Sequence, residues 1–494
     1  MADRAELGVL VRVMYRDSVA VVRNWLFGDE LTESHVSLLE DEEMDASSEL
    51  AYTEPKPSPH SRGCLANWHP KKALTLLWVL LPSFIARPLG YVTDNSAIPP
   101  ATSTSYLNGL RGLASLIVAI QHNTDEYLTY IRIGWGDAGN KHAIQLPFLR
   151  VLTSGGFMVT IFFVISGFAL AYSPLKKTHA GQSADAIGSL PSSIFRRPLR
   201  LFLPTVPVLI VTIILIHFGA FYIPERPIPI PPYPGGFWSQ VEFLWHTLLT
   251  IVSQSTTHSI MPQAWTLSAE YQGSLLVFLS CMAFARVSPP VRIVGMFAAF
   301  YYMFDMGRWQ QCLFLYGMFL ADLRHIRAKL PSATEGVSLA ITIVSVLFVI
   351  LALFLGGWPL LGNGYNAIGY TWLTWVPTHT MSPFSFFLSL SAILLVGALE
   401  NLPLLQRALN ARWVQYLGEI SYGLYLVHWV VGKSPIAKGV TMRMFLAGYS
   451  LTGAWAGGFA IAMVVSIWLA DIHWRLVDQK SVQFSHWLSK KMGI

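Results

Sequence analysis

One apolar segment near residue 110 carries an arginine and a histidine, two side chains that are costly inside a membrane. Arg111 and His122 have ten residues between them in the run that follows Asn108. Eleven helical steps of 100° return to within about 20° of the starting direction and rise roughly 16 Å. Both side chains therefore share one helix face, and an ionisable pair in such a segment predicts a functional site.

Two carboxylates follow this histidine at helical spacing. Asp125 and Glu126 lie three and four residues after His122, close enough to orient its ring and raise its basicity. An oriented neutral histidine can remove a proton from a hydroxyl. The alternatives are a packing role for His122 and an anchoring role for Arg111 at the membrane surface. The shared face favours the catalytic interpretation.

A group of basic residues opens a later apolar segment. Arg196, Arg197 and Arg200 precede the run that begins at residue 201. Arginines at a helix start can hold the pyrophosphate and a further phosphate of a nucleotide-like cofactor through bidentate contacts. Taken alone, the three residues fit better the rule that cytosolic loops of membrane proteins are basic.

Other polar residues in the apolar segments have less specific patterns. Glu270, near the luminal end of its segment, either orients a catalytic histidine, binds a substrate hydroxyl or caps its helix. Ser421, Tyr425 and His428 share a helix face, which favours a packing or pocket-lining seam over a second base. Ser166 is not in a Gly-x-Ser-x-Gly setting and is rejected as a nucleophile.

The composition shows what kind of element must position these residues. The 494 residues are 53% apolar and 13% charged, with a mean hydropathy of +0.46, whereas soluble domains are roughly 25% charged. This excludes an ordinary soluble enzyme and predicts an all-α polytopic membrane protein. The basic excess lies among apolar segments, so it indicates topology and not nucleic-acid binding. Three cysteines indicate neither a disulfide framework nor a metal site.

The apolar segments over residues 105–475 predict a membrane domain of about ten spanning helices. The basic loop 174–200 is assigned to the cytosol, and the loop 357–383, which has no Asp, Glu, Lys or Arg, to the opposite side. Both termini, including the tail 476–494, then lie in the cytosol. Three residues depart from the pattern: Lys433, Lys438 and Arg443.

The first hundred residues have a different composition. Residues 1–70 predict a cytosolic tail, with an amphipathic helix over 7–27 followed by a disordered acidic and proline-rich segment. Residues 71–104 form a short hydrophobic segment and a linker. The stretch 73–89 is short and broken by Pro82, which favours an in-plane or re-entrant helix over a span.

Five ordered sequence blocks resemble the acyltransferase 3 family of integral membrane O-acyltransferases over roughly residues 105–475. They are Asn108-Gly-Leu-Arg-Gly-Leu-Ala with His122, Phe162-Phe-Val-Ile-Ser-Gly-Phe, Arg196-Arg-Pro-Leu-Arg, Trp265-Thr-Leu-Ser-Ala-Glu and Gly418-Glu-Ile-Ser-Tyr-Gly-Leu-Tyr-Leu-Val-His-Trp. The resemblance implies ten spans and the transfer of an acetyl or other short acyl group from an acyl-coenzyme A to a hydroxyl. This chain departs from the family at Asn108, where an Asp is usual.

The resemblance also implies roles for His122, Arg111 and the three later arginines, which join Glu126 and Glu270 from the spacing argument above. Acyl-coenzyme A, with acetyl-coenzyme A first, is the co-substrate, and no tightly bound cofactor is expected. The N-terminal extension is similar to that of fungal members, which implies a small lipophilic metabolite or a sugar as acceptor, secondary metabolism and an endomembrane such as the endoplasmic reticulum. The expected catalytic residues are His122, Glu270 and Glu126, and the phosphate-binding residues are Arg111, Arg196, Arg197 and Arg200.

Two other functions fit the same residues. One is a multipass transporter of a lipophilic or glycosylated substrate, with the buried histidine and carboxylates as a proton relay. The other is a module that carries an acyl group across the membrane for a partner enzyme. Thioester hydrolysis by the purified chain separates an acyltransferase from the transporter, and transfer to a soluble acceptor separates it from the carrier module.

The predicted topology has a direct test by chemical labelling. A cysteine introduced by Ser183→Cys should react with a membrane-impermeant thiol reagent only after the cytosolic face is opened, and one introduced by Asn363→Cys only from the other side. The unsubstituted protein provides the background from its own cysteines. Labelling of both positions from the same side would contradict the assignment of the two loops.

Overall fold

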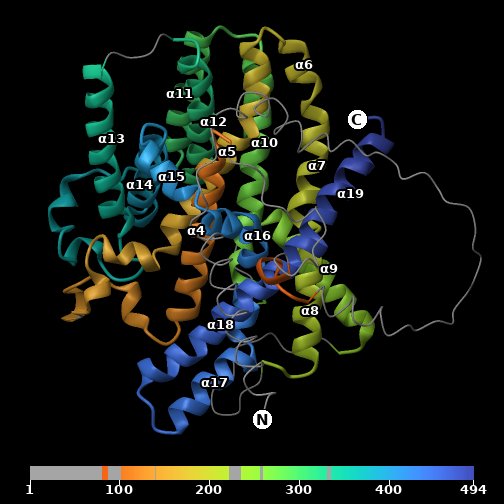
Figure 1. Ribbon diagram of the computed structural model, residues 1–494, viewed down its shortest axis with the longest axis vertical. Helices are drawn as coiled ribbons and strands as arrows, with labels where there is room; N and C mark the ends of the chain where they lie inside the picture. Colours follow the sequence, from red (N-terminus) through yellow and green to blue (C-terminus); the bar gives the residue numbers. More distant parts are fainter. Residues whose placement is uncertain (1–79, 87–101, 140, 222–234, 256–259, 331–334) are drawn as a thin grey trace, which may run out of the picture.

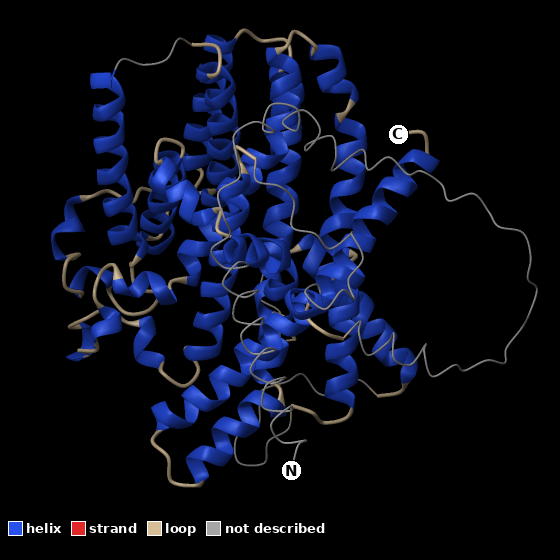
Figure 2. Ribbon diagram, in the orientation of Figure 1, coloured by secondary structure: helices blue, strands red, loops and turns tan. Residues whose placement is uncertain are grey.

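The computed structural model describes residues 80–86, 102–139, 141–221, 235–255, 260–330 and 335–494. Every regular element within these ranges is a helix (Figure 2), which confirms the predicted all-α fold class. Most of the long helices run in similar directions and form a bundle (Figure 1). The helix and tail predicted for residues 1–70 lie outside the described residues.

The helices follow one another along the whole of the described chain. The α-helices are α3 (Ser83–Ala86), α4 (Ser105–Thr124), α5 (Gly155–His179), α6 (Ser183–Gly188), α7 (Leu190–Phe202), α8 (Thr205–His217), α9 (Phe237–Ser253), α10 (Trp265–Phe284), α11 (Pro289–Asp305), α12 (Trp309–Arg327), α13 (Glu335–Gly356), α14 (Pro383–Leu399), α15 (Pro403–Leu409), α16 (Arg412–Lys433), α17 (Pro435–Leu446), α18 (Leu451–His473) and α19 (Gln479–Lys491). A π-helical turn, η10 (Trp474–Asp478), joins α18 to α19. Short 3-10 turns are η3 (Thr129–Arg132), η4 (Asp137–Gly139), η5 (Ala143–Gln145), η6 (Leu149–Thr153), η7 (Pro262–Ala264), η8 (Gly364–Asn366) and η9 (Thr371–Trp375).

Proline and serine mark several of the helix starts. Helix α14 begins at Pro383, a position where the missing N–H costs nothing, and the Ser382 side chain accepts a hydrogen bond from the Ser385 backbone N–H. Ser450 caps α18 in the same way through the Gly453 N–H. The local sequence therefore determines where these helices begin.

Five helical stretches are long and apolar enough to cross a membrane, and a sixth is obtained if α14 and α15, bent by 102°, form one broken span. The prediction of about ten spans is not confirmed by length and composition. Helices α9 and α11 have only 17 residues each, and α4 and α16 include polar and charged residues, such as Arg111 in α4 and Glu419 in α16. The five stretches are Gly155–His179, Ser183–His217, Pro262–Phe284, Gly336–Gly356 and Leu451–Lys491.

Exposure separates lipid-facing helices from interior ones. Helix α13 exposes large apolar side chains on several sides, among them Leu339, Ile341, Val344 and Val346. A helix that is apolar all round and still exposed is typical of a membrane protein. Helix α16, by contrast, buries most of its residues against other helices. The polar helix thus lies inside the bundle, where its charged side chains are shielded from lipid.

Three chain segments that the sequence assigns to the cytosolic side, at the ends of α5, α11 and α12, meet at one end of the bundle. Arg292, at the start of α11, holds Asp322 of α12 through two hydrogen bonds of 2.9 and 2.6 Å. His179, at the end of α5, lies 2.6 Å from the same carboxylate. All three side chains are buried. Helix α6 lies at this end, whereas the segment after α13 lies lower in the bundle (Figure 1).

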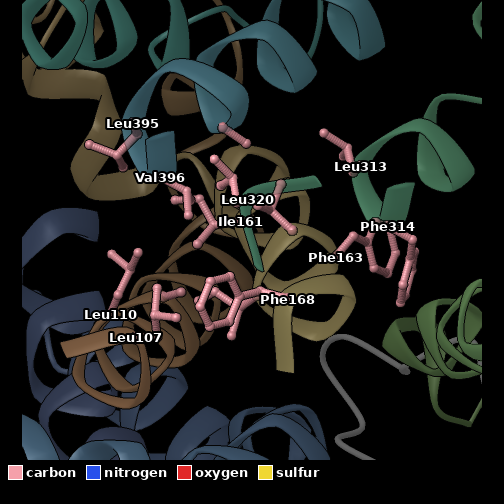
Figure 3. Close-up of a cluster of buried hydrophobic side chains, with 14 of the residues drawn as sticks. Leu107, Leu110, Ile161, Phe163, Phe168, Leu313, Phe314, Leu320, Leu395 and Val396 are labelled. Carbon is pink, nitrogen blue, oxygen red and sulfur yellow. The ribbon is translucent and has the colours of Figure 1, made fainter. Parts of the chain in front are cut away.

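The larger apolar core is built around α5. Ile161, Phe163 and Phe168 of this helix pack with residues of α4, α12 and α14 (Figure 3). Phe163 and Phe314 have ring centroids 5.4 Å apart. Because α5 contacts helices on several sides, it is the central support of this half of the molecule.

Two glycines allow α5 and α12 to approach closely. A Cβ atom added at Gly167 would overlap the backbone of Phe314, and one added at Gly317 would overlap the backbone of Val164 and Phe168. Small residues at helix contacts are a common means of packing in membranes, where apolar burial alone does not drive association. Gly167 belongs to the block Phe162-Phe-Val-Ile-Ser-Gly-Phe, so the role of this block includes helix packing.

Residues 80–86 are held against the C-terminal part of the bundle. The backbone N–H and hydroxyl of Ser83 donate to the buried carboxylate of Asp471. Tyr416 and Arg475 donate to the same carboxylate at 2.9 and 2.6 Å. The Trp468 indole N–H donates to the Leu80 carbonyl at 2.5 Å. The short segment is therefore part of the folded domain, and its in-plane or re-entrant character stays a prediction.

The glycine contact predicts a clear effect on stability. Gly167→Leu should push α5 away from α12, because its side chain has no space against the Phe314 backbone, and should destabilise the protein by about 3 kcal/mol or more. Gly336→Leu is the matched control, since nothing lies near the Cβ position of this membrane-helix glycine. The measurement is thermal unfolding together with the monodisperse fraction in detergent. Equal behaviour of the two variants would contradict the packing role.

Candidate active site

Helices α4 and α16 lie side by side and run in parallel. A Cβ atom at Gly112 would overlap Leu417 and Gly418, and one at Gly418 would overlap Asn108, so the two backbones touch here. Arg111 Nη2 donates to the Gly418 carbonyl at 3.1 Å, a pair 307 residues apart in sequence. Lys433 bonds to Glu126 near the far ends of the helices, also 307 residues apart. The constant separation shows that the parallel register holds along both helices.

This register places two histidines against each other. The rings of His122 and His428 are stacked, with centroids 5.3 Å apart and planes inclined by 26°. His428 Nδ1 lies 2.9 Å from the Leu424 carbonyl. A carbonyl only accepts, so Nδ1 carries the proton and neutral His428 has a bare lone pair on Nε2. That atom is buried and has no hydrogen-bond partner among the described residues.

The other residues of the predicted seam on α16 have ordinary packing contacts. The Ser421 hydroxyl donates to the Gly418 carbonyl at 2.6 Å, and the Tyr425 hydroxyl donates to the Gln263 carbonyl. The seam interpretation suits these two residues. His428 differs because its free nitrogen and its stacking partner both belong to the candidate site.

Arg111 lies near the other end of the shared face. Arg111 Nη2 donates a second hydrogen bond, to Asn108 Oδ1 at 2.8 Å. Asn108 Nδ2 in turn donates to Glu419 Oε1 at 2.9 Å. Asn108 therefore links the guanidinium to a carboxylate of α16.

Arg197 and Glu270 form an ion pair between α7 and α10. Arg197 Nη2 bonds to Glu270 Oε1, and Arg197 Nε donates to the Ser274 hydroxyl at 2.8 Å. Ser166 of α5 also lies within hydrogen-bonding reach of Glu270. Both charged side chains keep some contact with solvent, at 16% and 14% exposure. Glu270 thus holds an arginine, and in the part of the chain that the structure describes it is not hydrogen-bonded to His122.

The ion pair corrects the relative depth expected for these two residues. The sequence placed Glu270 near a luminal helix end and Arg197 at a cytosolic helix start. In the structure the arginines lie near the middle of the continuous stretch Ser183–His217, because α6, α7 and α8 follow one another with short breaks. Helix α10 begins at Trp265, and Glu270 in its second turn bonds to one of these arginines.

Arg200 joins this charged group, and Arg196 lies at its edge. Arg200 has an exposed side chain and lies close enough to Arg111, Arg197 and Asp478 to interact electrostatically. Arg196 Nη1 instead lies 2.6 Å from Nδ1 of His486 on α19. We call this group the arginine cluster; its members are Arg111, Arg196, Arg197, Arg200, Glu270, Glu419 and Asp478. Its four arginines exceed its three carboxylates, so the ionised cluster favours an anion.

Glu126 has a different environment from the one expected. Its two carboxylate oxygens bond to Lys433 and, at 2.7 Å, to Lys438. Burial alone would raise the pKa of Glu126, but the two lysines lower it below its ordinary value. Glu126 is therefore a well-stabilised anion and a poor proton acceptor. It lies beside His122 without bonding to it.

The two ends of the site are separated along one helix. Arg111 and His122 are eleven residues apart in α4, which corresponds to a rise of roughly 16 Å. An anionic group bound at the arginine cluster would thus need a long arm to reach the histidines. The arrangement can bind an anion at one end and transfer a proton at the other.

Three members of the site were not expected from the sequence: His428, Glu419 and Asp478. One signal for His428 is present in the sequence. His122 follows Gly112 by ten residues, and His428 follows Gly418 by ten residues. Two helices that touch at their glycines in parallel must then bring the histidines together.

Comparisons with known proteins point to one family of enzymes. The model of the acyltransferase 3 family, an acyltransferase domain, matches residues 104–474. O-acetyltransferase PaAT-1 of Phomopsis amygdali is 31% identical over 79% of this chain and 85% of its own length. Acyltransferase R4 of a Phoma species is 23% identical over 74% of this chain and 90% of its own. Acyltransferase clz18 of Cochliobolus lunatus is 23% identical over 66% of this chain and 82% of its own length. No solved structure matches.

Proposed function

Since the chain belongs to the acyltransferase 3 family, we propose that this acyltransferase moves an acetyl or other short acyl group from an acyl-coenzyme A to a hydroxyl. The observation that carries the proposal is the pairing of an arginine cluster with a histidine pair on one set of parallel helices. The name of the relative PaAT-1 favours acetyl as the acyl group.

The donor binds at the arginine cluster in this proposal. Coenzyme A carries phosphates at one end and its thiol at the end of a long flexible arm. Planar guanidinium groups suit phosphate oxygens because they donate in parallel pairs. Arg197 is held in place by Glu270 and Ser274, whereas the exposed Arg200 is free to meet the ligand. The arm then extends along α4 towards His122.

Acyl transfer requires one base and one leaving thiol. His122 accepts the proton of the acceptor hydroxyl as that oxygen attacks the thioester carbonyl. The carbon–sulfur bond then breaks, and the departing thiolate takes the proton from His122. His428 stacks on His122 and holds its ring plane. The scheme needs no acyl-enzyme, because the acceptor oxygen attacks the thioester directly while His122 takes its proton.

The relatives support a proposal for the acceptor and the cellular setting. The similar proteins are fungal acyltransferases, which supports a small lipophilic metabolite as acceptor and a role in secondary metabolism. The apolar helices support a membrane enzyme. We assign the arginine cluster to the cytosolic side of the histidine pair, both termini to the cytosol and the enzyme to an endomembrane.

The histidine pair makes a prediction about rate. His122→Ala should lower turnover by roughly 10² to 10⁴, and His428→Ala should lower it less, because His428 acts through His122. The double variant should be no slower than His122→Ala alone. Release of coenzyme A from acetyl-coenzyme A in the presence of a hydroxyl acceptor measures all three. A His122→Ala enzyme with more than half its activity would remove His122 from the reaction.

The arginine cluster makes a prediction about binding. Arg200→Ala and Arg197→Lys should each raise the apparent KM for acetyl-coenzyme A by roughly tenfold or more while changing that for the acceptor little. The lysine keeps a charge beside Glu270, which protects the fold. Lys480→Ala, at an exposed lysine of α19, is the control. Equal shifts of both Michaelis constants would show that the donor binds elsewhere.

A further inference from the structure

A small cavity lies beside His122, between α4, α16, α17 and α18. The space in which the centre of a water molecule can lie is about 10 Å³, which is roughly what one water molecule needs. Gly458 and Ala462 of α18 form one wall, and a Cβ atom added at Gly458 would overlap the Thr441 hydroxyl. Small residues on α18 thus leave a space of the size of a single water molecule.

The other walls of this cavity are polar. His122, Glu126, Lys433 and Thr441 all line it. The Thr441 hydroxyl donates to the Ala437 carbonyl at 3.3 Å, so its oxygen can still accept a hydrogen bond. Buried waters typically make about three hydrogen bonds, and cavities that stay dry are apolar. The composition of the walls therefore favours an ordered water molecule.

The ring of His122 needs an acceptor on this side if it acts as a base. A neutral imidazole has one N–H and one lone pair. When the lone pair faces the acceptor hydroxyl, the N–H must be donated elsewhere. The stacked contact with His428, with planes inclined by 26°, uses the ring faces and leaves the nitrogens at the ring edge for other partners. The cavity that His122 lines is where such a partner fits.

Glu126 can hold a water molecule in this cavity. One of its carboxylate oxygens accepts from Lys433 and the other from Lys438. An ionised carboxylate has about four acceptor sites, so each oxygen can accept one more hydrogen bond. Because the two lysines keep Glu126 ionised, a water molecule that touches it points a proton at the carboxylate and a lone pair away from it.

We propose that this cavity binds one water molecule, which accepts the N–H of His122 and donates to Glu126, with Thr441 as a further partner. Glu126 is then a positioning residue. Through the water it holds His122 in the tautomer whose lone pair faces the acceptor hydroxyl, and it stabilises the imidazolium that forms when the proton moves. The water site stands on the cavity alone, whereas its role in the reaction rests on the proposed function.

The first test measures the tautomer of His122 without any acyl donor. Ala462→Val places two methyl groups in the cavity and should expel the water. Ala460→Val is the matched control, because Ala460 is an exposed residue of the same helix. Ring ¹⁵N resonances of the purified full-length protein are recorded, and those of His122 are identified by their loss in His122→Ala. The unsubstituted protein and Ala460→Val should show one neutral tautomer, and Ala462→Val a mixture of two.

The second test measures the rate of coenzyme A release from acetyl-coenzyme A with a hydroxyl acceptor. Ala462→Val and Glu126→Gln should each lower turnover by roughly tenfold and leave the KM for acetyl-coenzyme A unchanged. The double variant should be no slower than the slower single variant, because both changes act through the same water. Glu126→Gln keeps the shape of the side chain, so it carries the test if Ala462→Val does not fold in a thermal unfolding measurement.

The outcomes separate the water site from the proposed function. A tautomer mixture in the unsubstituted protein, a single tautomer retained in folded Ala462→Val, or an equal loss of turnover in Ala460→Val would overturn the water site. A tautomer change in Ala462→Val without coenzyme A release from any variant would support the water site and count against acyl transfer. Turnover that Ala462→Val and Glu126→Gln both leave unchanged would support the enzyme and overturn the positioning role of Glu126.

Discussion

The backbone contact between Gly112 and Gly418 is the constraint on which the rest of the site depends. Neither residue has a side chain, so α4 and α16 approach closely enough to fix both the distance and the register of the two helices. Arg111 then reaches the Gly418 carbonyl, and His122 meets His428. A larger residue at either position would move every pair along the two helices at once. The relative position of the two histidine rings is thus set by a glycine contact about ten residues away from them.

The electrostatic organisation follows from the cost of placing charge in a membrane protein. Around the histidine pair, charged groups gather at two places, the arginine cluster and the lysines around Glu126, and each contains carboxylates that offset part of the positive charge. The histidine pair lies between them, and His428 bonds there only to a backbone carbonyl. A low dielectric between two charged regions strengthens the field that each exerts on a polar transition state.

Local periodicity explains which parts of the site were predictable. The shared face of Arg111 and His122 depends only on the geometry of one helix, and the all-α class depends on composition, so both were accessible from the sequence. The pairing of Arg197 with Glu270, 73 residues apart, and of Glu126 with Lys433 depends on how helices pack. The helical period of 3.6 residues shows which face of a helix is polar, but it does not show which other helix packs against that face. The number of spans was also hard to predict, because interior helices of a bundle carry polar residues and do not resemble lipid-facing ones.

The attachment of residues 80–86 affects how the enzyme can be shortened or tagged. The family match begins at residue 104, and a boundary drawn there would discard the segment that donates to Asp471. That carboxylate is fully buried, and it would keep only Tyr416 and Arg475 as donors. Arg475 would also lose the Leu81 carbonyl that it binds at 2.8 Å. A recombinant version that is cut at the family boundary would thus lack part of its own interior, and a cleavable tag belongs before residue 80.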